Sequence, residues 1–448
     1  MNTLRIGAGA GYSGDRLEPA VELARDGQLD YLVFECLAER TIALAQQARL
    51  ADPRAGFDPL LAERMRAVLP YVRRGGQRLR IITNMGAANP RGAARQVSVI
   101  AAELGVQGLK VAAVEGDDVL DVLRQHPEWT LDNGLTVAGL GERLVSANAY
   151  LGVEGIVQAL ALDADVVITG RVADPSLFLA PQVHHFGWPA DDWRRRGRGT
   201  LTGHLLECAG QVSGGYFADP GMKDVADLAR LGFPFADIDS EGLATLGKVA
   251  GSGGRIDVAT CTEQLLYEVH DPRRYLTPDV TADFSGVHLQ ACGKDQVRVS
   301  GGEGTARPQH LKVTVGYRDG WIGEGQMSYG GPNAEARARL AGRIVEERLA
   351  LTGVAVEELR CELMGVDSLH ASHFGMGGEP WEVRLRVAAR CPSREAAQAV
   401  ANEVETLYTN GPAGGGGATR QVREVLAVAS LYLPRELAQP QVHLEQCP

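Results

Sequence analysis

The sequence predicts a three-layer α/β domain with a parallel, Rossmann-like sheet at residues 1–285, followed by an α+β domain of ferredoxin-like, split βαβ type at 286–448. Three observations support this prediction. Short β-branched runs alternate with longer helical patterns over the first 175 residues, which is typical of parallel strands in βαβ units. Each run stops abruptly in a cluster of Gly, acid, amide or Arg residues. After the boundary the order changes to β-α-β-β-α-β.

Five apolar runs are the predicted strands of the first domain. They lie at 4–6, 31–34, 80–82, 110–114 and 166–168. Helical periodicity occurs at 17–26, 38–49, 58–74, 91–104, 117–125 and 152–162, and further helices are expected after Pro175 and at 201–211. The Gly-rich stretch 212–260 is interpreted as loop. Because ligands of open α/β sheets bind beyond the carboxyl ends of the strands, we expect the five polar strand ends to face one cleft.

The second domain is predicted from alternating apolar patterns and helical periodicity. Runs at 287–291 and 296–300 indicate a hairpin or a meander. The following elements are a strand at 311–317, a helix at 334–351, strands at 358–365 and 381–390, a helix at 394–409 and a strand at 420–433. Ser393 is a good N-cap for the last helix.

The composition excludes several classes of function. The net charge of −11 over 448 residues argues against nucleic acid as a partner, because binding to a polyanion needs a basic face. No apolar run of about 18 residues is present, so the chain is expected not to enter a membrane. The seven cysteines are widely spaced without a Cys-x-x-Cys pair, which favours reduced thiols. These features predict a cytoplasmic protein.

The first strand end carries the pattern Gly9-x-Gly11-x-x-Gly14, and Glu35 ends the next strand. This arrangement matches the dinucleotide-binding fingerprint. However, Asp15 places a negative charge where a pyrophosphate would bind. The alternative is a tight Gly turn that brings backbone N–H groups close to a different ligand.

Three carboxylates, Glu115, Asp117 and Asp118, follow the fourth strand. They could bind a divalent cation, with Asp117 and Asp118 as ligands, or supply a general base whose pKa is raised by like-charge crowding. The alternative is that Asp117 caps the next helix and the other two acids favour its positive end.

Arg171 and Asp174 follow the fifth strand, where Arg171 is suited to bidentate binding of a substrate carboxylate or phosphate. The alternative is an internal Arg171–Asp174 ion pair that stabilises the turn. Asn84, after the third strand, could polarise a carbonyl oxygen. His204 and Glu207 share one helical face by i, i+3 spacing, as a hydrogen-bonded buried couple or as part of a metal or substrate site.

Several motifs together resemble the acyclic terpene utilisation, AtuA-like, family, over nearly the whole chain. The matching segments are 5–12, Asp30-Tyr-Leu-Val-Phe-Glu-Cys-Leu-Ala-Glu39, Glu115-Gly-Asp-Asp118, Ala147-Asn-Ala-Tyr-Leu-Gly152, Val167-Ile-Thr-Gly-Arg-Val-Ala-Asp174, Gly203-His-Leu-Leu-Glu-Cys-Ala209, Glu263-Gln-Leu-Leu-Tyr-Glu268, Asp283-Phe-Ser-Gly-Val287 and Asn410-Gly-Pro-Ala-Gly-Gly-Gly-Gly417. The resemblance implies breakdown of branched terpenoids through acyl-CoA carboxylic acids. Many relatives carry a further C-terminal domain, so a separate small subunit is an alternative to the expected homo-oligomer.

The functional hypothesis is a catabolic enzyme for a small branched carboxylic acid or its acyl-CoA thioester, a hydratase or lyase. Arg171 holds a carboxylate, Asn84 and the backbone of Gly7–Gly14 polarise a carbonyl, and one of the acids at 115–118 moves the proton. Replacing Arg171 by Ala is expected to abolish turnover and leave the fold intact. The alternatives are a nicotinamide-dependent oxidoreductase and a non-catalytic subunit of a two-component enzyme. No cofactor is assigned, and a divalent cation is one option.

Overall fold

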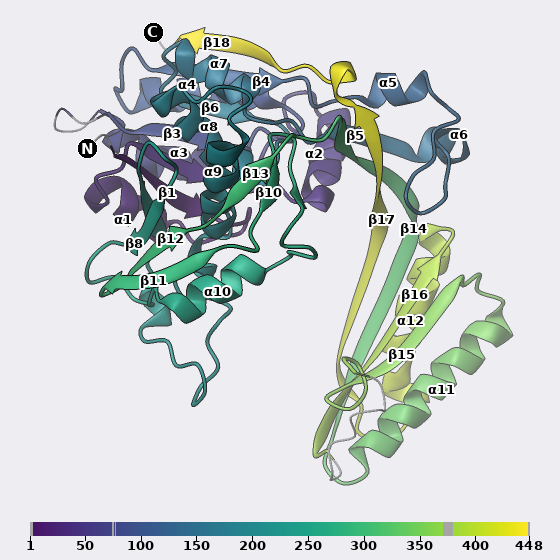
Figure 1. The fold of residues 1–448 in the computed structure, drawn as a ribbon. Coiled ribbons are helices and arrows are strands. Elements are labelled where there is room, and N and C mark those ends of the chain that lie inside the picture. Colours follow the sequence, from purple (N-terminus) through teal and green to yellow (C-terminus); the bar gives the residue numbers. More distant parts are fainter. Residues whose placement is uncertain (1–2, 74–75, 77, 371–379, 447–448) are drawn as a thin grey trace. The chain divides into compact units, whose positions relative to one another are not determined.

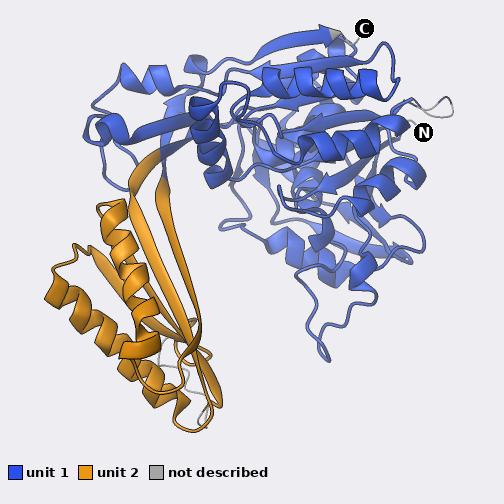
Figure 2. Cartoon of the chain, turned by 180° about the vertical axis from the view of Figure 1, so that it is seen from behind, with its two compact units in different colours: residues 1–316, 428–448 blue, residues 317–427 orange. Residues whose placement is uncertain are grey.

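A computed structural model describes residues 3–446 except 74–75, 77 and 371–379. The chain divides into two compact units (Figure 2), residues 1–316 with 428–448, and residues 317–427. The expected boundary at 285/286 therefore differs from both divisions, because the chain leaves the first unit at 316 and returns to it at 428. Strands β14 (His310–Gly330) and β17 (Gly416–Pro434) contain these two divisions.

The first unit contains a mixed ten-stranded sheet (Figure 1) with a parallel block at its centre. In order along the sheet, the strands are β11 (His288–Gly293), β12 (Gln296–Ser300), β8 (Ala244–Lys248), β7 (Pro234–Ile238), β1 (Leu4–Ala10), β2 (Tyr31–Phe34), β3 (Arg80–Thr83), β6 (Val166–Thr169), β4 (Lys110–Glu115) and β18 (Gln441–Gln446). The five predicted strands are β1, β2, β3, β6 and β4, and they pair in parallel.

The sheet as a whole corrects the prediction of a parallel, Rossmann-like sheet. Antiparallel strands extend the parallel block at both ends, through β7 beside β1 and β18 beside β4. The parallel order 1-2-3-6-4 also differs from the 3-2-1-4-5-6 order of the dinucleotide-binding fold. Strands β7 and β8 lie in the stretch 212–260 that the sequence indicated as loop. The predicted hairpin is present as β11–β12, but it joins this sheet rather than the second domain.

Helices cover the parallel strands, whose side chains are almost entirely buried, as expected for strands covered on both faces. The α-helices of this unit are α1 (Glu18–Asp26), α2 (Glu39–Ala51), α3 (Leu61–Val68), α4 (Pro90–Glu103), α5 (Leu120–Arg124), α6 (Val137–Leu140), α7 (Glu154–Ala161), α8 (Asp174–Phe186), α9 (Trp193–Leu206) and α10 (Val258–Leu266). The helix expected at 201–211 begins earlier, at Trp193, where Asp192 caps it by accepting from the Arg195 N–H. Three-residue 3₁₀ turns lie at Leu69–Tyr71, Gly141–Arg143, Ala209–Gln211, Leu228–Arg230 and Arg435–Leu437.

Four further strands complete the first unit. Strand β5 (Leu144–Ala149) pairs with β14, and β9 (Tyr275–Leu276), β10 (Thr281–Asp283) and β13 (Glu303–Thr305) form a small antiparallel sheet. Six of the seven cysteines are free thiols, and Cys447 lies outside the described residues. No helix in the described part of the chain combines the length and apolar composition needed to cross a bilayer.

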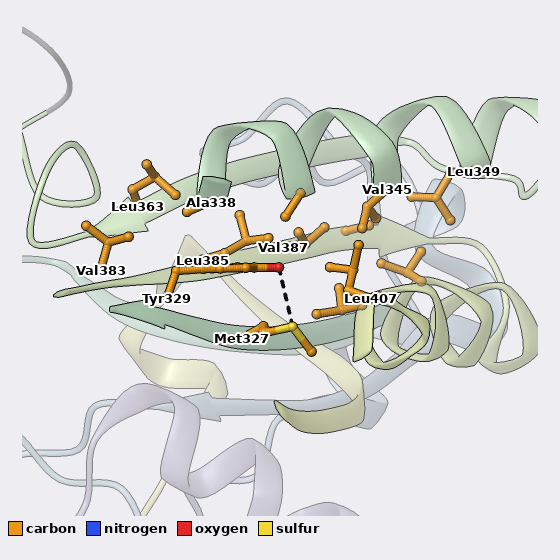
Figure 3. Close-up of a cluster of buried hydrophobic side chains, with 14 of the residues drawn as sticks. Met327, Tyr329, Ala338, Val345, Leu349, Leu363, Val383, Leu385, Val387 and Leu407 are labelled. Atoms are coloured by element: carbon orange, nitrogen blue, oxygen red, sulfur yellow. Dashed lines mark hydrogen bonds between the residues drawn. The ribbon is translucent and has the colours of Figure 1, made fainter. Parts of the chain in front are cut away.

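The second unit has the predicted β-α-β-β-α-β order. After β14 come α11 (Ala334–Thr352), β15 (Glu358–Met364), β16 (Glu382–Cys391), α12 (Arg394–Asn410) and β17. The sheet order is β15-β16-β14-β17, and β16 pairs antiparallel with both β15 and β14. Strict alternation of burial along β16 shows that one face of the sheet packs on the helices. Figure 3 shows the resulting core, in which the Tyr329 hydroxyl donates to Met327 Sδ at 3.4 Å.

Candidate functional site

Two adjoining cavities in the first unit form the candidate site. The acidic cavity has a volume of about 630 Å³, and its wall carries Asp15, Glu35, Asp174, Glu207, Cys208 and Glu268. The second cavity has a volume of about 1090 Å³, and its wall includes Glu39, Arg40, Tyr150, Arg171, His310 and Lys312. Leu37, Ala38, Asp174 and Glu268 line both cavities, so these four residues form a shared wall. Both volumes are sufficient for a small organic ligand.

Glu35 is a carboxyl group of the acidic cavity whose pKa is strongly raised. It directly follows β2, and its Oε1 accepts from the backbone N–H of Leu37 at 2.8 Å and from Asn84 Nδ2 at 2.9 Å. Burial, together with the nearby charge of Asp174, raises the pKa of Glu35 to about 8, because removing water disfavours the carboxylate. Glu35 therefore carries a proton at neutral pH.

Asn84 holds Glu35 in position from the end of β3. Its side chain is fully buried, and its Oδ1 accepts from the Cys36 backbone N–H at 2.8 Å while its Nδ2 donates to Glu35. Asn84 does not line either cavity. The structure thus places this predicted carbonyl-polarising residue behind Glu35, where it orients the carboxyl group.

Glu207 is a second carboxyl group of the same wall, and it is coupled to His204. His204 Nδ1 lies 2.9 Å from Glu207 Oε1, and its Nε2 lies 3.2 Å from the Leu265 carbonyl oxygen. A carbonyl only accepts, so Nε2 carries a hydrogen, and one further proton is shared between Nδ1 and Glu207. Burial raises the pKa of Glu207 to about 7, although the His204 bond opposes this. Glu207 Oε2 is buried and has no partner among the described residues.

His204 itself does not line the cavity. The ring is 1% exposed and packs against Phe284 and Tyr275, with centroid separations of 5.7 Å and 5.2 Å. Of the alternatives that the i, i+3 spacing left open, the structure shows the hydrogen-bonded buried couple.

Backbone strain collects around the acidic cavity. Tyr216 and Glu268 line it with φ angles of 61° and 59°, and Ala209, between two lining residues, has a φ of 42°. Non-glycine residues rarely adopt positive φ, and such strain persists where the surrounding structure enforces it, often at functional sites. Three of the nine non-glycine residues with positive φ in the described part of the chain thus lie at this cavity.

Of the three glycines of the fingerprint pattern, Gly9 is buried, Gly11 lines the acidic cavity and Gly14 is exposed. A Cβ at Gly9 would meet the Phe34 ring at 2.7 Å, and one at Gly11 would meet the Cys208 backbone at 2.5 Å. A Cβ at Gly14 would meet only the ring of Tyr12, at 2.7 Å. The Gly11 N–H donates to Asp15 Oδ2 at 2.9 Å, so an internal carboxylate uses the donor that a pyrophosphate would need.

Arg171 lies at the floor of the second cavity with its guanidinium turned into the protein. It is 1% exposed, donates to the carbonyl oxygens of Leu37 and Val172, and pairs with Asp174. Its Cζ lies 4.2 Å from the centroid of the Tyr150 ring. The Arg171–Asp174 ion pair, the alternative considered from the sequence, is present and connects three segments of the cavity wall.

The acids at 115–118 lie outside both cavities. Glu115 is 3.3 Å from His443 Nε2, and Asp118 is exposed and accepts from the Leu120 N–H at 3.1 Å. Asp117 is buried, and its Oδ2 accepts from Asn148 Nδ2 and from the Arg171 backbone N–H, both at 2.9 Å. Burial raises the pKa of Asp117 to about 6. Asp117 therefore anchors the turn that carries Arg171 rather than facing its guanidinium.

No group of three or more His, Cys, Asp or Glu side chains within the described ranges is arranged to hold a metal ion. Asp117 and Asp118, the pair considered as cation ligands, belong to no such group. Their side chains accept hydrogen bonds from different backbone and amide donors, and only one of them is buried.

Four of the named residues of the acidic wall, Asp15, Glu207, Cys208 and Glu268, were missing from the predicted site. Glu207 had a detectable signal, namely its i, i+3 spacing to His204. Glu268 had none beyond its place in a family-like segment, because it follows α10 in a strained turn and reaches the cavity only through the tertiary fold.

Comparison with known proteins identifies the family. The model of the acyclic terpene utilisation family protein AtuA matches residues 4–444. No curated protein and no solved structure matches the chain. Because the family match covers nearly the full length, the chain belongs to the acyclic terpene utilisation family AtuA.

Proposed function

We propose that this protein is an enzyme of acyclic terpenoid catabolism, a hydratase or lyase that acts on a branched carboxylic acid or its acyl-CoA thioester. One observation carries the proposal: Glu35 and Glu207, with pKa values raised to about 8 and about 7, line the same cavity. Acid–base catalysis at neutral pH needs groups whose pKa lies near the working pH. The family membership supports the terpenoid substrate class.

In this proposal, Glu207 is the general base and Glu35 the general acid of a hydration. The Glu207 carboxylate takes a proton from water while the water oxygen bonds to the β-carbon of a double bond conjugated to the substrate carbonyl. The α-carbon takes the proton of the Glu35 carboxyl group, so the double bond is consumed and no net charge is produced. In the reverse elimination each group exchanges its role.

The proposal moves the acid–base roles away from Glu115, Asp117 and Asp118. These side chains contact strand and turn partners and do not line either cavity. A catalytic role for them stays a prediction. The nicotinamide alternative gains no support from the Gly9–Gly14 turn, because Asp15 already accepts from the Gly11 N–H.

Hydrogen–deuterium exchange at the substrate α-carbon tests the proposal. The full chain is incubated in deuterium oxide with a panel of branched 2-enoic and 3-hydroxy acids, as free acids and as CoA thioesters, and products are followed by mass spectrometry. We expect water addition and α-deuterium incorporation with at least one compound, and a loss of at least about 100-fold in Glu35→Gln and Glu207→Gln.

Glu115→Gln is the matched control, because this acid lies outside both cavities and is expected to keep full activity. Full activity of Glu35→Gln and Glu207→Gln together with loss in Glu115→Gln would reverse the assignment. Absence of exchange across the panel would contradict the hydratase or lyase chemistry.

A further inference from the structure

The two adjoining cavities have opposite charge on either side of their shared wall. Beyond that wall, the acidic cavity carries Asp15, Glu35 and Glu207 against the single base Arg16. Beyond that wall, the second cavity carries the basic side chains Arg40, His310 and Lys312 against the acid Glu39, and its Arg171 is paired with Asp174 of the shared wall. A ligand that extends through both cavities therefore meets bases at one end and carboxyl groups at the other.

Within the second cavity, not every basic side chain is paired with an acid. Lys312 Nζ donates to Glu39 Oε1 at 2.5 Å, and the Tyr150 hydroxyl donates to the same oxygen at 3.0 Å. Glu39 thereby balances one cation. Arg40 and His310 are exposed, and neither has an acidic partner in the part of the chain that the structure describes. The donors available to a ligand anion are thus the guanidinium of Arg40, the imidazole of His310 and the remaining N–H groups of Lys312.

Apolar and aromatic side chains separate these bases from the acidic cavity. Tyr275, Leu276 and Leu311 line the second cavity together with the basic groups, and Leu37 and Ala38 belong to the shared wall. Such a surface suits a hydrocarbon stem, because burying apolar area contributes about 25 cal/mol per Å². The bases of the second cavity are therefore followed by this apolar surface and the shared-wall acids Asp174 and Glu268, and then by the carboxyl groups of the acidic cavity.

From this arrangement we infer that the second cavity binds the charged end of an elongated organic anion, a carboxylate or a phosphate ester, while the uncharged end lies in the acidic cavity. The opposite orientation places the anion among the carboxyl groups of Asp15, Glu35 and Glu207 and away from the basic groups of the second cavity. The inference rests on the proposed function in one respect, since in a CoA thioester the phosphates lie far from the double bond conjugated to the thioester carbonyl and can occupy the second cavity while that double bond reaches Glu35 and Glu207.

Calorimetric titration of the full chain tests this inference without turnover. The probes are octanoate, its uncharged counterpart octan-1-ol, and coenzyme A as the phosphate-bearing probe. We expect one of the two anions to bind at least about 10-fold more tightly than octan-1-ol. Arg40→Met and Lys312→Met are each expected to weaken the binding of that anion about 10-fold, which is the loss expected for one charged hydrogen bond. Octanoate and coenzyme A distinguish a carboxylate from a phosphate ester as the recognised group.

Arg91→Met is the matched control, since Arg91 is an exposed arginine of α4 outside both cavities, and we expect it to bind like the wild type. The inference is overturned if neither anion binds better than octan-1-ol. It is also overturned if Arg40→Met and Lys312→Met leave anion binding unchanged while Glu207→Gln tightens it, because the charge then lies in the acidic cavity. Either result leaves the exchange experiment on Glu35→Gln intact, so the two proposals fail separately.

Discussion

Two groups of carboxylates in the first unit differ in how they are placed. Glu115, Asp117 and Asp118 are almost adjacent in the sequence, and the fold separates them, onto an edge pair with His443, a buried anchor and an exposed turn. Glu35 and Glu207 are far apart in the sequence, and the fold brings both to one cavity. The difference teaches that a dense acidic motif need not make a site, whereas acids from distant segments can share one cavity. A raised pKa does not separate the two groups, because burial raises the pKa of Asp117 to about 6 as well.

The largest effect is expected at Arg171, which supports the wall between these groups. Arg171→Ala is expected to lower the free energy of unfolding by about 3 kcal/mol, since it removes a buried ion pair and two hydrogen bonds to carbonyl oxygens. Urea denaturation checks this. Arg40→Ala, on the exposed rim of the second cavity, is the control and is expected to change stability by less than about 0.5 kcal/mol. Equal stability of the two variants would contradict the anchoring role of Arg171. It would instead agree with the expectation from the sequence that Arg171→Ala leaves the fold intact.

Asp117 and Asp118 offer a direct test within the acidic motif. Asp117→Ala is expected to cost about 2 kcal/mol of unfolding free energy, because the Arg171 and Asn148 N–H donors lose their buried acceptor. Asp118→Ala is expected to cost less than about 0.5 kcal/mol, since its one bond to Leu120 is exposed. Chemical denaturation of both variants under one condition gives the comparison. If Asp118→Ala lost more unfolding free energy than Asp117→Ala, the hydrogen bonds of Asp117 would not be the ones that stabilise this turn.

Gly11 and Gly14 test how the first strand end meets the acidic wall. Gly11→Ala is expected to cost about 1–3 kcal/mol, because its methyl group would overlap the Cys208 backbone beside Glu207. Gly14→Ala is expected to cost less, since it meets only the ring of Tyr12, which is 61% exposed and can move. Thermal unfolding of the pair measures the difference. If Gly14→Ala is the more damaging change, the close approach of the strand end to Cys208 is not what requires glycine.

The pH dependence of stability sharpens the description of Glu35. Its pKa in the folded protein is about 8 against an ordinary 4.5. The folded state therefore holds the proton more tightly than the unfolded state, and the resulting stability is complete below the ordinary value and lost as the pH rises through about 8. Wild-type stability relative to Glu35→Gln is expected to fall between about pH 5 and about pH 9 in urea titrations. A difference that is constant with pH would contradict the raised pKa.

Much of the architecture is predictable from local pattern. The five β-branched runs are the five parallel strands, and the β-α-β-β-α-β order of the second unit is present. The misses are elements without a strong local signal. Strands β7 and β8 contain Pro234 and Gly247 within a Gly-rich stretch, and they form because β1 offers β7 an edge and β7 then pairs with β8.

The candidate site was predictable only in part. Glu35 and Asp174 were expected from their positions at strand ends, and both line the acidic cavity. Asn84 was expected to touch substrate, and the structure shows it holding Glu35 instead. Glu207 was considered only together with His204, and Glu268 was missed as a site residue, because they come from a helix end and a turn far along the chain.

The sequence by itself determined which segments form strands and helices and which side chains follow the strand ends, because side-chain periodicity and turn chemistry act over a few residues. Only the tertiary structure decided which carboxyl groups share a cavity, which are used as anchors, and where the bases gather. Those outcomes depend on burial and on contacts between distant segments, and burial is the physical cause that raises the pKa values of Glu35 and Glu207.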